Sequence, residues 1–120
     1  MKMVTIIGAG PAGNYLAWKL AEKGYPVEIY EEHTVVGKPI QCTGIVTKTL
    51  RDLVPIDPSF FVNQLSSVQV VAPHNDTFTV PLEDFVICRT SFDQFLLKKA
   101  ISAGAKVYKG HKYIRFEKGK

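Results

Sequence analysis

The chain has 120 residues and a formal net charge of +4, and 46% of its residues are hydrophobic. This length fits one small domain, and the apolar fraction is that of a globular chain, which excludes a disordered or fibrous protein. No apolar run approaches the roughly twenty residues of a membrane-spanning helix. The first predicted strand begins at once, without a cleavable signal, so we expect a cytoplasmic protein.

The charge is unevenly distributed. Residues 98–120 carry a net charge of +7 and residues 1–97 carry −3. A basic end could meet nucleic acid or anionic lipid. However, its lysines alternate with apolar residues over residues 106–116, as on the solvated face of strands. We favour the solvated face and predict no nucleic-acid partner.

The thiols and imidazoles do not form a ligand pattern. Cys42 and Cys88 are too few for a disulfide framework or a cysteine metal site, so reduced thiols are expected. The histidines His33, His74 and His111 lie in predicted loops and turns, without metal-ligand spacing to cysteines or acids. His33 could touch a bound nucleotide, but a solvated loop histidine is the preferred interpretation.

The most informative stretch comes first in the chain. Residues 4–13 read V-T-I-I-G-A-G-P-A-G. The β-branched run predicts a buried strand, and Gly8, Gly10 and Gly13 follow in the G-x-G-x-x-G spacing of dinucleotide-binding proteins. Gly8 would allow the tight turn, Gly10 would let a pyrophosphate approach the backbone, and Gly13 would let helix and strand pack closely.

The rest of a βαβ unit surrounds this motif. Residues 14–23 have apolar residues at helical spacing, Gly24 can end the helix, and residues 27–31 form a second strand that ends in Glu31. The positive N-terminus of the helix favours an anion such as a pyrophosphate.

Glu31 is the predicted ribose ligand. It lies eighteen residues after Gly13, close to the spacing at which an acid accepts hydrogen bonds from a ribose. An acid there argues against a ribose 2′-phosphate. The alternative is a glycine-rich turn of some other α/β protein, with Glu31 an ordinary solvated charge.

A loop and a small β region follow. Residues 32–44 contain glycines and a proline and predict an irregular loop, and residues 47–54 predict a short helix capped by Thr47. Residues 67–72 and 77–80 predict a hairpin with a four-residue loop, and residues 85–89 predict a third strand.

The chain then returns to a helix and strands. Ser91 and Gln94 predict a capping box, and an apolar stripe continues to Gly104. Residues 105–109 and 113–116 are predicted strands. The predicted sheet order is the second strand, the first, and then residues 105–109. The fold class is therefore α/β, with a Rossmann-like βαβ unit.

Four features lie in order along the chain: G-A-G-P-A-G over residues 8–13, Glu31, G-K-P-I-Q-C-T-G over residues 37–44, and Arg89 with Phe92, Asp93 and Leu96 after it. On these residues the chain resembles the FAD-dependent geranylgeranyl reductase family. The resemblance implies a discontinuous FAD-binding domain, residues 1–44 and 89–120, which is incomplete at its C-terminus. Residues 45–88 would be a β insertion at the start of a substrate domain.

The resemblance also implies site residues. Gly8, Gly10, Ala12 and Gly13 would line the pyrophosphate, and Glu31 would hold the adenosine ribose. The backbone of Cys42, Thr43 and Gly44 would run beside the flavin. Arg89 would reach the cofactor, and the backbone of Tyr113 would meet the adenine edge.

The implied reaction is the reduction of isolated double bonds in prenyl lipid chains by hydride transfer from reduced flavin. The implied partners are a prenyl lipid, an unidentified electron donor and a membrane surface in peripheral contact. A flavin hydroxylase of the same fold group and a non-catalytic dinucleotide-binding module are the alternatives.

Two residues allow more than one interpretation. Cys42 could be a catalytic thiol near the flavin or a small side chain fitted into a tight loop. Arg89 could contact a phosphate or the ribityl chain, or it could be a surface charge at a strand end, and we favour contact.

Overall fold

A computed structural model of the protein describes residues 1–118. Lys120 of the predicted basic end therefore lies outside the described residues. The chain divides into two compact units: Met1–Ile40 with Thr90–Lys120, and Gln41–Arg89. We call them the first and second units.

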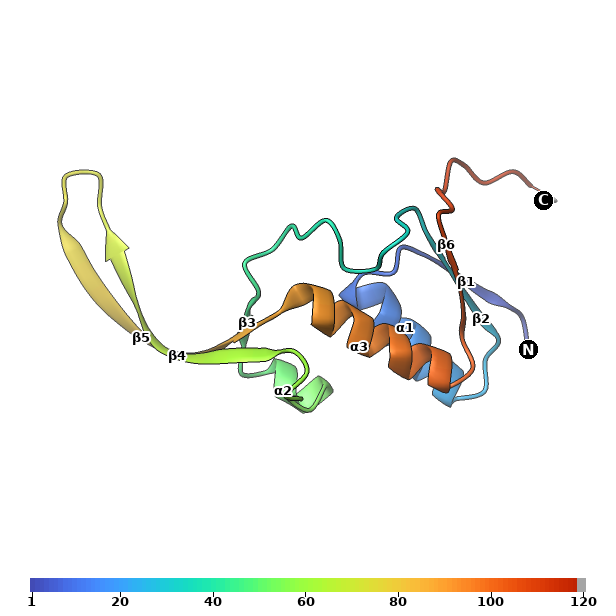
Figure 1. The fold of residues 1–120 in the computed structure, drawn as a ribbon, viewed down its shortest axis with the longest axis horizontal. Helices are drawn as coiled ribbons and strands as arrows, with labels where there is room; N and C mark the ends of the chain where they lie inside the picture. The colour runs from blue at the N-terminus through green and yellow to red at the C-terminus, as the bar shows by residue number, and fades with distance from the viewer. Residues whose placement is uncertain (119–120) are drawn as a thin grey trace. The chain divides into compact units, whose positions relative to one another are not determined.

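The first unit is built on a parallel sheet of β1 (Val4–Ile7), β2 (Val27–Glu31) and β6 (Lys106–Lys109). Two helices, α1 (Pro11–Glu22) and α3 (Arg89–Ser102), run beside each other along it (Figure 1). The predicted βαβ unit and its α/β class are confirmed.

The core of the first unit lies between one face of this sheet and the two helices. Its members are apolar side chains at alternate strand positions and small residues on the helices, among them Ile6, Ile29, Ala17 and Ala100. Ile29, Ala17 and Ala100 are fully buried. Alanines on the helices let both approach the sheet closely, so a short chain can bury a continuous core.

The predicted order of the sheet is wrong. β2, rather than β1, is the central strand: it pairs with β1 on one side and with β6 on the other. The strands of the second unit form a separate sheet, so β6 is in effect the third parallel strand of the first unit. In a dinucleotide fold the third strand lies outside the second. Tyr30 and Tyr108, opposite each other, stack at 5.0 Å between ring centroids.

The second unit contains an antiparallel sheet in the order β3, β5, β4. Its elements are β3 (Ile45–Thr47), α2 (Leu50–Leu53), β4 (Phe61–Val71) and β5 (Thr77–Ile87). The predicted hairpin is confirmed. The helix predicted over residues 47–54 is shorter, because Thr47 belongs to β3 and Thr49 is the N-cap.

The separate third strand predicted at residues 85–89 is wrong. It is the end of β5, which continues through Pro81. Proline lacks an N–H and usually interrupts a central strand. Pro81 lies opposite Ser67, next to a register shift in β4, and β3 pairs with β5 only at residues 84–86. The irregular ladder there accommodates the proline.

The start of α3 also differs from the prediction. The helix includes Arg89 and Thr90, so Ser91 is not its cap. Gln94 does not complete a capping box, because its amide donates to the carbonyl of Val36 at 3.1 Å. The hydroxyl of Thr90 donates to the carbonyl of Gly37 at 2.8 Å. Both polar side chains therefore hold the loop after β2 against the helix.

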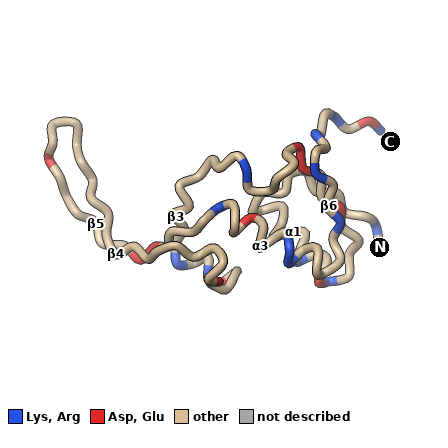
Figure 2. Tube along the Cα trace, viewed as in Figure 1, with Lys and Arg blue, Asp and Glu red and all other residues tan. Residues whose placement is uncertain are grey.

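The strand predicted over residues 113–116 is absent. Residues 111–117 have no regular structure, and Ile114 and Phe116 are 81% and 76% exposed. The lysines of α3 and β6 and the basic residues of this segment are exposed, and Figure 2 marks the basic positions along the chain trace. Within residues 1–118, every helix is too short or too polar to cross a membrane.

Candidate functional site

The glycine motif forms a tight turn between β1 and α1. Gly8 has φ +99°, in the region that favours glycine, and Gly10 is the N-cap of α1. The first helical hydrogen bond runs from Asn14 N–H to Gly10 O at 2.9 Å. The N–H groups of Ala12 and Gly13 precede that bond, at the positive end of the helix. This is the geometry of an anion-binding turn.

Gly13 lies where α1 and β1 come closest. A Cβ atom there would lie 2.2 Å from the carbonyl oxygen of Gly8 and 3.2 Å from Cγ2 of Ile6. The predicted packing role of Gly13 is thus confirmed. Gly10 differs, because a Cβ at that position would meet no atom within 4 Å. The space beside Gly10 is open for a ligand.

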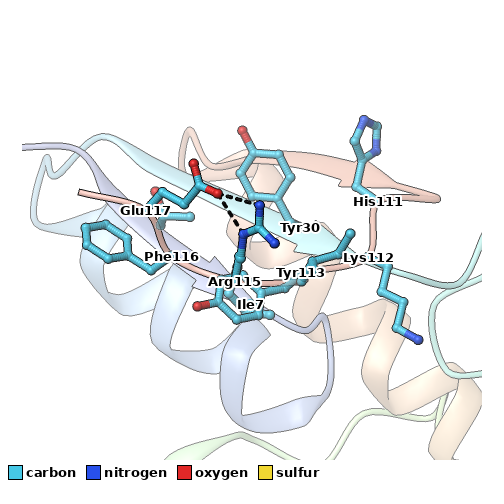
Figure 3. A pocket seen from close by; sticks show the side chains of 10 residues that line it. Ile7, Tyr30, His111, Lys112, Tyr113, Arg115, Phe116 and Glu117 are labelled. Atoms are coloured by element: carbon cyan, nitrogen blue, oxygen red, sulfur yellow. Dashed lines mark hydrogen bonds and ion pairs between the residues drawn. The ribbon is translucent and has the colours of Figure 1, made fainter. Parts of the chain in front are cut away.

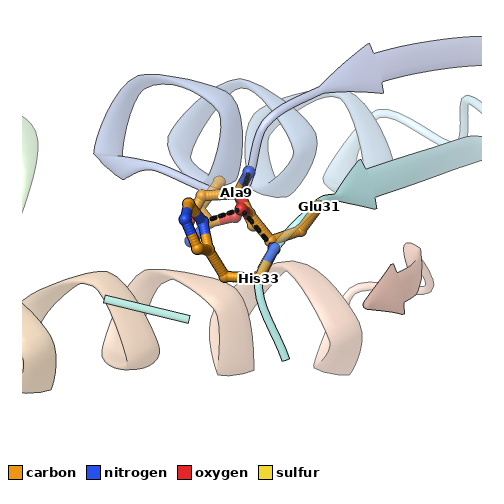
Figure 4. A network of polar contacts seen from close by, with 4 residues as sticks. Ala9, Glu31 and His33 are labelled. Carbon is orange, nitrogen blue, oxygen red and sulfur yellow. Dashed lines mark hydrogen bonds and ion pairs between the residues drawn. The ribbon is translucent and has the colours of Figure 1, made fainter. Parts of the chain in front are cut away.

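Glu31 is joined to the glycine turn and to His33 (Figure 4). Its Oε2 accepts the N–H of Ala9 at 2.7 Å. Its Oε1 accepts the N–H of His33 at 3.1 Å and lies 2.8 Å from Nδ1 of the His33 ring. Partial burial raises the pKa of Glu31, but these hydrogen bonds outweigh it, so the pKa falls below its ordinary value. The carboxylate is ionised and fixed.

Two cavities meet at this end of the sheet. One, of about 310 Å³, is lined by Gly8, Glu31 and Tyr113, together with Ile7, Tyr30, Glu32, His111 and Lys112. Three of the predicted cofactor residues therefore surround one space. The other, of about 650 Å³, lies between Thr5, Ile7 and Tyr30 on the sheet and residues 111–117 (Figure 3).

The remaining predicted site residues are Cys42, Thr43, Gly44 and Arg89, all in the second unit. Cys42 and Thr43 are exposed, and the thiol of Cys42 accepts the N–H of Gly44 at 3.4 Å. A Cβ on Gly44 would meet the carbonyl of Ile87 at 2.2 Å. That the four residues contact the same cofactor as the glycine motif stays a prediction.

Cys42 and Cys88 are not joined to each other in a disulfide. Among residues 1–118, no cluster of three or more His, Cys, Asp or Glu side chains could hold a metal ion.

Asn14 is a functional candidate that the sequence did not reveal. It is fully buried in the first turns of α1, and its amide donates to the carbonyls of Ala9 and Asp93 at 3.0 and 2.9 Å. It thereby ties the glycine turn to α3. The available signal was a polar residue on the apolar face of a predicted helix, directly after Gly13.

Comparison with protein families agrees with this geometry. Residues 6–49 match a family model described as an NAD(P)-binding Rossmann-like domain. A digeranylgeranylglycerophospholipid reductase of Methanopyrus kandleri is 35% identical over 106 residues, which is 87% of this chain and 27% of the relative. One from Methanococcoides burtonii is 31% identical over 111 residues, again with 87% and 27% coverage.

The chain is also similar to solved structures. A geranylgeranyl bacteriochlorophyll reductase-like protein of Thermoplasma acidophilum matches with a TM-score of 0.83 and 25% identity, over 99% of this chain and 34% of that protein. The flavin-dependent brominase Bmp2 matches with a TM-score of 0.64 and 25% identity, over 89% and 29%. The chain spans about a quarter of the length of the curated relatives named above.

Proposed function

The chain is a relative of the geranylgeranyl reductases, and from this relationship we propose that it forms the FAD-binding part of a flavin-dependent oxidoreductase. The observation that carries the proposal is the single cavity lined by Gly8, Glu31 and Tyr113, which lies where β1 gives way to the glycine turn. A turn that binds phosphate and a carboxylate that binds ribose are what an adenosine diphosphate group needs.

The residues present fit this cofactor. The open space beside Gly10 and the N–H groups of Ala12 and Gly13 suit the pyrophosphate. The ionised Glu31 suits a ribose diol and would repel a 2′-phosphate, because both would be anionic. FAD in its reduced form, when bound, would supply a hydride to a carbon–carbon double bond. The first unit would bind and orient the FAD.

For the substrate, we propose a prenyl lipid chain of the kind named in the relatives, which are digeranylgeranylglycerophospholipid reductases. Such a substrate also implies peripheral contact with a membrane surface. The exposed apolar side chains of the β4–β5 hairpin, including Val62, Val71 and Phe78, are consistent with a unit whose partner surface is apolar.

The cofactor assignment is tested by titrating the purified protein with FAD and with NAD. We expect FAD to bind more tightly, and Gly10→Ala to weaken FAD at least tenfold, because its methyl group fills the space beside the turn. The melting temperature of Gly10→Ala should be close to that of the unaltered protein. A protein that binds NAD and not FAD would support the non-catalytic dinucleotide module instead.

For catalysis, we propose that the thiol of Cys42 acts near the flavin. Cys42→Ser should lower the turnover of a geranylgeranyl lipid with reduced flavin while leaving FAD affinity unchanged. Cys88→Ser is the matched control, because Cys88 is the other cysteine of the chain, is less exposed than Cys42 and is not a predicted site residue. Equal turnover of the two variants would leave Cys42 a structural residue of its loop.

A further inference from the structure

His33 makes two contacts with the same carboxylate oxygen. Its backbone N–H and its Nδ1 atom lie 3.1 and 2.8 Å from Oε1 of Glu31 (Figure 4). The Glu31 side chain is 12% exposed and the His33 side chain is 47% exposed. Although its side chain is half-exposed, His33 differs from a solvated loop histidine, because its backbone and its ring both contact one carboxylate oxygen.

The proton on the ring can be assigned from chemistry. An ionised carboxylate only accepts hydrogen bonds, so Nδ1 carries the proton that lies between His33 and Glu31. Ala9 donates to the other oxygen, Oε2, at 2.7 Å. Both oxygens of Glu31 therefore have a donor from the protein, and the carboxylate is held in one orientation.

The backbone around His33 is fixed as well. The carbonyl of Glu31 accepts the N–H of His111 at 2.9 Å, and the carbonyl of His33 accepts the N–H of Gly110 at 3.3 Å. The turn after β6 thus holds the turn after β2. Because the backbone is anchored on both sides of the ring, the position of the imidazole is a built feature of the first unit.

We propose that His33 is a positioning residue for the adenosine ribose. By holding Oε1, it keeps the carboxylate of Glu31 oriented toward the cavity that Glu31 lines with Gly8 and Tyr113. A carboxylate oxygen can accept more than one hydrogen bond, so Glu31 keeps capacity for the ribose hydroxyls. The inference rests on the proposed FAD binding, and it adds a specific residue that acts through Glu31.

The test is a double-mutant cycle on the dissociation constant for FAD, with the protein, Glu31→Gln, His33→Ala and the double variant. We expect each single variant to weaken FAD about tenfold, and His33→Ala to have less than a twofold effect in the Glu31→Gln background. His33→Asn, which restores a side-chain donor, should recover most of the affinity. A purely structural role for His33 would not depend on Glu31.

His74→Ala is the matched control, because His74 makes a similar contact with Asp76, at 3.0 Å, in the exposed hairpin turn. It should bind FAD as the unaltered protein does. If His33→Ala and His33→Asn bind FAD normally while Glu31→Gln does not, the inference about His33 is wrong and FAD binding stands. Equal weakening by His33→Ala with and without Glu31 would also overturn it. If the unaltered protein does not bind FAD, the proposed function itself fails.

Discussion

Gly13 should be among the residues least tolerant of substitution. A methyl group there would lie 2.2 Å from the Gly8 carbonyl, a backbone atom that cannot move without distorting the turn. We expect Gly13→Ala to lower the free energy of unfolding by about 1–3 kcal/mol, the usual cost of overpacking. Urea denaturation measures it.

Gly10→Ala is the control for this prediction. Gly10 has φ −81°, which alanine adopts readily, and a Cβ there meets nothing within 4 Å. Its stability cost should not exceed about 1 kcal/mol, the cost of a poorer N-cap. Equal destabilisation by the two substitutions would contradict the distinct roles of the two glycines.

Asn14 should matter for stability despite being polar. Removing its amide leaves the carbonyls of Ala9 and Asp93 without their donor in a buried place. We expect Asn14→Ala to cost about 2–4 kcal/mol in the free energy of unfolding, from two buried acceptors losing their hydrogen bonds. Asn14→Asp should cost more, because a carboxylate would face the same carbonyls. A loss below about 0.5 kcal/mol in thermal or urea unfolding would refute this role.

The lowered pKa of Glu31 gives stability a defined pH dependence. Its pKa is below the ordinary value of 4.5 in the folded protein, so the stabilisation is fully present above about pH 4.5 and is lost as pH falls through the folded pKa. Urea midpoints measured from pH 6 down to pH 3 should fall less steeply for Glu31→Gln than for the unaltered protein. Parallel curves would mean that Glu31 does not contribute.

The helix α3 is held to the loop after β2 by Thr90 and by Gln94, and of these two only Gln94 belongs to the predicted capping box. The hydroxyl of Thr90 donates to Gly37 O at 2.8 Å. Thr90→Val should therefore cost about 1 kcal/mol of unfolding free energy, the net value of one hydrogen bond. Ser91→Ala, at the predicted cap, should cost less than Thr90→Val. The reverse order would restore the predicted capping box.

The predicted elements succeeded where local chemistry decides them. The glycine turn, α1 and β2 follow from a glycine spacing and an apolar period that only one local structure satisfies, and β2 ends at Glu31 as expected. The predictions failed where residues that are distant in sequence determine the structure of an element. Pro81 would normally end a strand, but an irregular ladder lets β5 continue through it. Gln94 was predicted to cap the start of its own helix. Its amide instead donates to the carbonyl of Val36, which is far away in sequence.

The two units should differ in protection from hydrogen exchange. β2 is paired on both sides and carries the fully buried Ile29, whereas residues 73–76 of the hairpin turn are exposed. Amides of β2 should exchange most slowly, and those of the turn should exchange within the shortest labelling time. Mass spectrometry of exchanged peptides measures both. Similar rates would contradict the sheet order found here.

Much of the candidate site could be read from the sequence, because spacing alone brings Gly8, Gly13 and Glu31 together. The sheet order could not be predicted, because no local pattern in residues 106–109 indicates whether they pair with β1 or with β2. The contact of His33 with Glu31 was also inaccessible. It depends on the backbone anchored by Gly110 and His111, which are far away in sequence.

The side chain of Trp18 has a practical consequence. It is the only tryptophan in the chain, its Nε1 donates to Glu22 at 2.6 Å, and Lys19 Nζ lies 3.8 Å from its ring centroid. Trp18 follows Gly10 by eight residues, or about 12 Å along the helix axis. The glycine turn is the proposed phosphate site of FAD, and the flavin ring of that cofactor absorbs at the wavelengths at which indole emits. The protein therefore carries its own optical reporter, and quenching of its emission can follow occupancy of the glycine turn without any label.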